Sequence, residues 1–149
     1  MAYTLVVVDM QYRFRASRNK RVRDNCIREV KLAMKRQSDI ILLEYIGFGK
    51  TLPSIKNAIS SYPKAIVVRK GDDDGSKEVA KAIKSYKLSR KLRVVGVNTD
   101  CCVYQTTSSL SLKHHFSIDV ITKACNSACL GDHRHGLVCL KKLPRVKLK

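Results

Sequence analysis

Five short runs rich in valine and isoleucine recur along the chain, and the segments between them carry apolar residues at helical spacing. The runs cover residues 4–8, 40–45, 65–68, 92–97 and 118–122. They are apolar throughout, which is the pattern of strands buried on both faces. Such strands alternating with helices form a parallel sheet between two helical layers. The sequence therefore predicts an α/β three-layer sandwich with a five- or six-stranded, mostly parallel sheet.

The intervening segments complete a Rossmann-like arrangement of strands and helices. We expect helices over residues 22–36, 77–86 and 132–143, one beginning near Cys101, and a shorter one over 54–60 after Pro53. No internal repeat or linker divides the chain, so residues 1–149 are predicted to form a single domain. The C-terminal residues 145–149, RVKLK, are expected to fray.

Polar residues follow three of the predicted strands. Ligands of parallel sheets bind beyond the carboxyl ends of the strands. Asp9 follows the first strand, Arg69 and Lys70 follow the third, and the turn 98–102 follows the fourth. We therefore expect these residues to converge on one cleft.

The stretch VVGVNTDCCVYQTT, residues 94–107, runs from a buried strand through a polar turn into a helix. A thiol in the first turn of a helix meets unpaired backbone N–H groups and the positive end of the helix dipole, and both favour a thiolate. Asp100 or Thr99 can cap this helix. The turn therefore suits a cysteine nucleophile.

Several motifs along the chain are similar to those of one enzyme family. They are VVVDMQ at the start, AIVVRKG at the third strand, GVNTDCCV at the fourth, and a late histidine before a leucine-rich helix in DHRHGLVCLKKL. Together they resemble the isochorismatase-like cysteine hydrolases, which include nicotinamidases and N-carbamoyl amide hydrolases. The resemblance covers nearly the whole chain, and it implies hydrolysis of a small amide, carbamoyl or related substrate.

The resemblance also implies a role for each matching residue. The spacing Thr-Asp-x-Cys-Val makes Cys102, not Cys101, the nucleophile. Asp9 would be the general base, and Lys70 would keep Asp9 ionised and hold the thiolate. The Val97–Asn98 peptide bond would be cis, and the backbone N–H groups of Asn98 and Cys102 would form an oxyanion hole.

Four further residues are candidates for binding the substrate, namely Gln11, Glu44, Tyr45 and Cys101. The metal-binding Asp-x-His of nicotinamidases is replaced here by LLEYIGFGK, and all histidines lie at position 114 or later. No metal and no cofactor are therefore predicted, and nicotinamide is a less favoured substrate. His133 and His135 are assigned a surface or capping role.

The acidic run 72–74 in GDDDGS stands where many relatives carry an aromatic residue, so the pocket wall must differ. Acids placed before Ser76 favour capping of the next helix, and cation binding is the alternative.

The chain is strongly basic, with a formal net charge of +18. This charge attracts polyanions, and it would equally attract an anionic small-molecule substrate. Residues 13–23, RFRASRNKRVR, are a solvated loop and helix start or a site for an anionic ligand or nucleic acid. Because no strand carries the aromatic pattern that stacks bases, a polyanion- or nucleic-acid-binding protein is kept as the alternative function.

The cysteine content and the N-terminus bear on location and assembly. None of the six cysteines forms a CxxC pair and no signal-peptide pattern is recognised, so free thiols and a cytoplasmic location are expected. No apolar run is long enough to span a membrane. A homo-oligomer is expected because isochorismatase-like hydrolases, which this chain resembles, often form oligomers.

Overall fold

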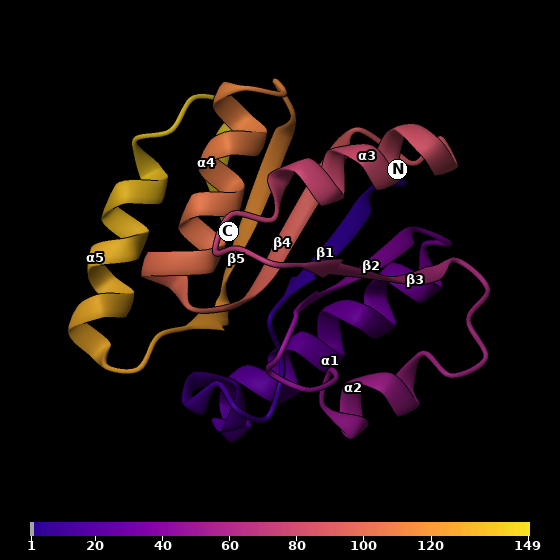
Figure 1. The fold of residues 1–149 in the computed structure, drawn as a ribbon, viewed down its shortest axis with the longest axis horizontal. Coiled ribbons are helices and arrows are strands. Elements are labelled where there is room, and N and C mark those ends of the chain that lie inside the picture. Colours follow the sequence, from indigo (N-terminus) through magenta and orange to yellow (C-terminus); the bar gives the residue numbers. More distant parts are fainter. Residues whose placement is uncertain (1) are drawn as a thin grey trace.

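A computed structural model describes residues 2–149 and places six strands in one parallel sheet (Figure 1). The strands are β1 (Thr4–Val8), β2 (Asp39–Tyr45), β3 (Ala65–Lys70), β4 (Lys91–Val97), β5 (Ser117–Asn126) and β6 (Val146–Leu148). Their order across the sheet is β3-β2-β1-β4-β5-β6, and every neighbouring pair is parallel. The predicted α/β class is confirmed, with six strands.

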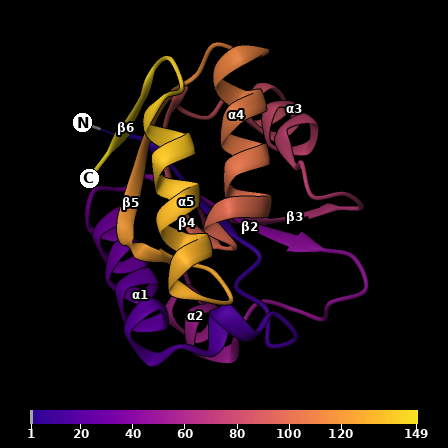
Figure 2. The same ribbon diagram turned by 90° about the vertical axis from the view of Figure 1, so that its left-hand side faces the viewer.

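Helices cover both faces of this sheet, as Figure 2 shows. They are α1 (Lys20–Lys35), α2 (Pro53–Ala58), α3 (Ser76–Tyr86), α4 (Tyr104–Leu112) and α5 (Leu130–Lys141), with a short 3-10 turn at Arg15–Arg18 and a π-helical turn, η2, at Thr99–Val103. Side chains of α1 and α2 belong to one apolar cluster, and those of α3, α4 and α5 belong to another on the opposite face. None of these helices is long and apolar enough to cross a membrane.

The central strand β1 supplies side chains to both apolar clusters. Leu5 and Val7 point to the cluster under α1, whereas Val6 and Val8 point to the one under α3 and α4. Successive side chains of a strand alternate between the faces of a sheet, so a strand covered on both sides must be apolar at every position. This explains the continuous run that marked the strand in the sequence.

The direction in which the chain crosses the sheet reverses beside β1. Strands β2 and β3 are added on one side, and the chain then returns to place β4 on the other side. Such a reversal opens a crevice beyond the carboxyl ends of the two strands that flank it. Here these ends lead directly into Asp9, after β1, and into Asn98 and η2, after β4.

The C-terminal segment does not fray, so that expectation is wrong. Residues Val146–Leu148 form β6 and pair with β5 at the edge of the sheet (Figure 2). Val146 and Leu148 pack against the core, and the Lys149 ammonium lies 3.1 Å from an Asp119 carboxylate oxygen. The lysines that suggested a solvated tail are the charged side chains that commonly protect an edge strand.

Candidate active site

A buried ion pair joins the ends of β1 and β3. Asp9 and Lys70 are both 0% exposed, and the Lys70 Nζ lies 3.1 Å from the Asp9 Oδ2. The same ammonium donates to the carbonyl oxygens of Asp72 at 2.8 Å and Asp73 at 3.3 Å. It also lies 3.9 Å from the centre of the Tyr45 ring. These contacts fix the lysine charge beside Asp9 although the two strands are not neighbours.

The turn after β4 presents Cys102 to this pair. The Val97–Asn98 peptide bond is cis, which confirms the expectation drawn from the family resemblance. The backbone N–H groups of Cys101 and Val103 both donate to the Asn98 carbonyl at 3.1 Å, which closes η2. Cys102 is 2% exposed and is close enough to Asp9 for each group to shift the pKa of the other.

Helix α5 supports η2, the turn that carries Cys102, from outside. The Thr99 hydroxyl and the His133 Nδ1 are 2.7 Å apart, and the Ser127 hydroxyl donates to the Asp100 carboxylate at 2.7 Å. Thr99 and Asp100 therefore tie the turn to neighbouring segments instead of capping the helix, which carries no side-chain cap. At Gly136 the helix backbone approaches that of the turn so closely that a Cβ atom would lie 2.7 Å from the Asp100 nitrogen.

Burial governs the protonation of Cys102. Loss of solvent, followed by the negative charge of Asp9, raises the pKa of the Cys102 thiol well above its usual range, and Lys70 opposes this only in part. Burial therefore opposes the thiolate that the helix dipole favours. Burial also raises the pKa of Asp9 despite the neighbouring lysine.

The Asp9 carboxylate keeps unused acceptor capacity. Neither of its buried oxygens accepts a hydrogen bond of regular geometry from the described residues. Its ion pair with Lys70 offsets its charge without filling every lone pair. A carboxylate of this kind beside a protonated thiol has the chemistry to take up the thiol proton.

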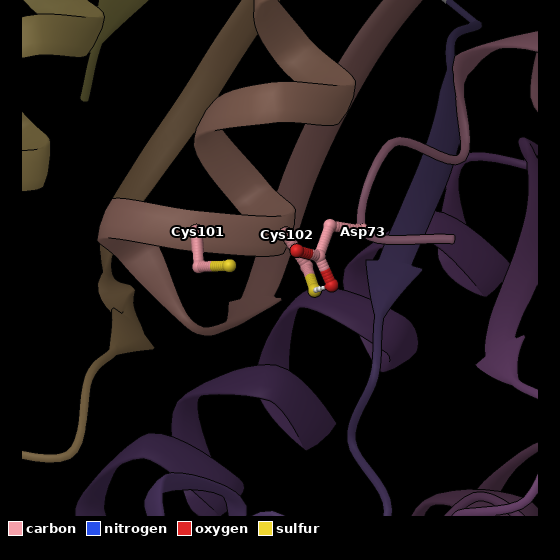
Figure 3. Close-up of side chains that lie close together, drawn as sticks. All are labelled: Asp73, Cys101 and Cys102. Carbon is pink, nitrogen blue, oxygen red and sulfur yellow. Dashed lines mark hydrogen bonds between the residues drawn. The ribbon is translucent and has the colours of Figure 1, made fainter.

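Asp73 lies beside Cys102, although no sequence motif places it in the site. Its Oδ1 lies 3.8 Å from the Cys102 Sγ, and Figure 3 shows Asp73 facing that thiol, with Cys101 beside it. Of the acidic run, Asp74 takes the expected role at the start of α3, since it accepts from the Ser76 N–H at 2.8 Å. The feature of the sequence that pointed to this position was the acidic run 72–74, which replaces the aromatic residue of many relatives.

The predicted substrate-binding residues have different surroundings. The Gln11 side chain is buried, donates to the carbonyls of Tyr45 and Gly49, and accepts from the Tyr45 N–H at 2.8 Å. Glu44 accepts from the N–H and hydroxyl of Thr51 at 2.7 and 2.8 Å. Cys101 is half-buried beside Cys102. Gln11 and Glu44 thus order the loop that follows β2.

A cavity of about 240 Å³ lies beyond the end of β2. Glu44, Tyr45 and Arg69 line it, whereas Asp9, Lys70 and Cys102 do not. Burial of the hydroxyl and the carboxylate of Asp73 raise the pKa of Tyr45 to about 12, so its hydroxyl stays protonated. Tyr45 therefore separates an open cavity from the closed trio.

The fold and this geometry define a class of protein: a three-layer α/β domain with a carboxylate, an ammonium and a thiol buried at the switch point of its sheet. The model of the isochorismatase domain matches residues 3–145. The chain therefore belongs to the isochorismatase domain family, as the motifs indicated.

Solved structures share the fold at low sequence identity. The nicotinamidase SaPncA of Staphylococcus aureus is 20% identical, with a TM-score of 0.84 and 100% of both chains covered. The MAR1 ribonuclease of Caenorhabditis elegans is 19% identical, with a TM-score of 0.86, and the match covers 99% of this chain and 77% of that one. An isochorismatase-like hydrolase of Alkaliphilus metalliredigens is 14% identical, with a TM-score of 0.80 over 100% and 87% of the chains. No match is found among curated proteins.

Proposed function

We propose that the protein hydrolyses a small amide, carbamoyl or related substrate through a covalent intermediate on Cys102. The observation that carries the proposal is the burial of Asp9, Lys70 and Cys102 together at the switch point of the sheet. Family membership and the likeness to nicotinamidases favour the same chemistry. The proposal gives each of the three residues one role.

The first half of the reaction forms a thioester. Asp9 removes the Cys102 proton as the sulfur attacks the substrate carbonyl, and a C–S bond forms. The resulting tetrahedral oxyanion would be held by the backbone N–H groups of Asn98 and Cys102. Asp9 then passes the proton to the leaving nitrogen, the C–N bond breaks, and the amine departs.

The second half releases the acid. Asp9, again ionised, takes a proton from a water molecule, whose oxygen attacks the thioester carbon. The C–S bond breaks and the proton returns to the sulfur, so the free thiol is restored. Lys70 balances the charge of Asp9 in each ionised state, because opposite charges at 3.1 Å stabilise each other in a buried site.

Substrate access requires a local movement. The three residues are at most 2% exposed, and the loop that carries Asp73 lies against Cys102. Tyr45 lines the cavity beyond β2 and its hydroxyl is close to Asp73, so displacement of this loop would open a path from that cavity toward Cys102. We therefore expect the substrate to enter from the end of β2.

A panel of small amides and carbamoyl compounds, nicotinamide included, tests the proposal. We expect one panel member to be hydrolysed, an acyl adduct on Cys102 by mass spectrometry, and loss of turnover in Cys102→Ala. Cys139→Ala is the matched control, because Cys139 is a half-exposed thiol on α5, outside the site. Turnover that survives in Cys102→Ala would refute the proposal.

A second candidate function is polyanion binding, favoured by a basic groove beside α3. The groove has a volume of about 740 Å³, and its basic residues are Lys77, Lys81, Lys84, Lys87 and Arg90. Contacts with phosphates release counterions, so RNA binding here would weaken steeply with salt. Binding that is unaffected by Lys81→Gln and Lys84→Gln together would exclude this groove.

A further inference from the structure

We propose that Asp73, Cys101 and Cys102 form a binding site for a thiophilic divalent cation such as Zn²⁺. The carboxylate and thiol atoms of the three side chains lie within 4.8 Å of one another. Two come from η2 and one from the loop after β3. Figure 3 shows the Asp73 carboxylate against the Cys102 sulfur, with the Cys101 sulfur pointing in their direction. Thiolate and carboxylate are both zinc ligands, and three protein ligands leave the fourth position to water.

The spacing of these atoms is close to that of a tetrahedral site. Zn–S bonds of about 2.3 Å and Zn–O bonds of about 2.0–2.2 Å hold ligand atoms roughly 3.5–3.8 Å apart. The Asp73 Oδ1 and the Cys102 Sγ are 3.8 Å apart without an ion. Rotation of the half-buried Cys101 and Asp73 side chains would bring the other ligand atoms, which lie within 4.8 Å of one another, to this spacing.

The surrounding charges permit a cation at this point. Lys70 is the nearby positive group, but its ammonium is paired with Asp9 at 3.1 Å and donates to two backbone carbonyls. Asp73 brings an uncompensated negative charge, since no cationic side chain pairs with it among the described residues. Binding of M²⁺ releases one proton from each thiol, and the two thiolates neutralise the ion.

Occupation of this site has a consequence that rests on the proposed hydrolysis. A metal bound by the Cys102 sulfur removes the electron pair that would attack the substrate. The ion would also tie the Asp73 loop to η2 and keep the site closed. Zinc should therefore act as a reversible inhibitor, and a chelator should restore turnover.

Cobalt titration of the reduced full-length protein tests the site without relying on turnover. Co²⁺ bound by thiolates gives a near-ultraviolet charge-transfer band and visible bands typical of four-coordination. We expect saturation at one equivalent and displacement by Zn²⁺. Cys101→Ser and Asp73→Asn should each weaken binding at least about 10-fold, since even loss of an outer-shell partner costs about 10–100-fold. Circular dichroism confirms that the variants fold.

The control removes the other thiol that could bind the ion with a histidine. The Cys139 Sγ and the His135 Nε2 lie 3.7 Å apart on α5. Cys139→Ser should keep the cobalt spectrum unchanged. Absence of a thiolate band, or a band lost in Cys139→Ser and kept in Cys101→Ser, overturns the proposal. If the cobalt–thiolate band is normal but zinc does not inhibit turnover, the metal site stands, and the proposal that Cys102 is the nucleophile is contradicted.

Discussion

The contact between α5 and η2 can be tested by adding one methyl group. A Cβ atom added at Gly136 would lie 2.7 Å from the Thr99 carbonyl carbon and the Asp100 nitrogen. That is roughly 0.7 Å less than the shortest ordinary contact of about 3.4 Å. Both neighbours are backbone atoms of the turn, so no side-chain rotation relieves the clash. Gly136→Ala must move α5, the turn, or both.

The free energy of unfolding should fall by about 1 kcal/mol, within a range of about 0–2 kcal/mol. Overpacking of this kind costs about 1–3 kcal/mol. Alanine in place of glycine inside a helix raises the free energy of unfolding by about 1 kcal/mol. Gly131→Ala on the same helix is the matched control, because its nearest neighbour to a new Cβ is the Cys129 Sγ at 4.0 Å. The control variant has the higher helix propensity of alanine without the clash. The free energies of unfolding of the two variants should therefore differ by about 2 kcal/mol.

Thermal unfolding and the hydrolysis assay together measure the effect. A difference of about 2 kcal/mol corresponds to about 4–8 °C in melting temperature for a chain of this size. Displacement of a reacting group by about 1 Å can cost about 100-fold in rate, so turnover should fall more in Gly136→Ala than its stability accounts for. Equal stability and equal turnover in the two variants would show that α5 does not hold the turn.

Two further predictions follow from the protonation of the site. In the proposed mechanism Asp9 must be ionised to accept the Cys102 proton, and burial raises its pKa above 3.8. The value of kcat/KM should therefore fall with decreasing pH through a pH above 3.8. Lys70→Gln should move this fall in kcat/KM to higher pH, because Lys70 lowers the pKa of Asp9. A fall at or below pH 3.8 in the native protein would contradict the argument that burial raises the pKa of Asp9. Iodoacetamide at neutral pH should modify the exposed Cys129 before the buried Cys102, as mapped by mass spectrometry. Faster labelling of Cys102 would mean that its thiolate is already formed.

The sequence predicts the strands and their chemistry better than the environment of the site. Asp9 and Lys70 could be placed because each comes at the end of an apolar strand, and parallel strands end at one edge. Protonation could not be predicted, since it depends on how deeply Cys102 is buried. Asp73 was missed because its approach to the thiol depends on the path of a loop, and loop conformation has no periodic pattern.

The same burial argues for proton transfer only during attack on the substrate. With Cys102 protonated, the charges of Asp9 and Lys70 offset each other, and the buried trio is neutral as a whole. Loss of the thiol proton to bulk water would leave one uncompensated negative charge in a site that already faces Asp73. Transfer of the Cys102 proton to Asp9 leaves the net charge of the trio unchanged. The negative charge moves from the Asp9 oxygen to the sulfur and, as the sulfur attacks, to the substrate oxygen. In the proposed mechanism, attack on the substrate is therefore concerted with proton transfer to Asp9, and no standing thiolate is formed beforehand.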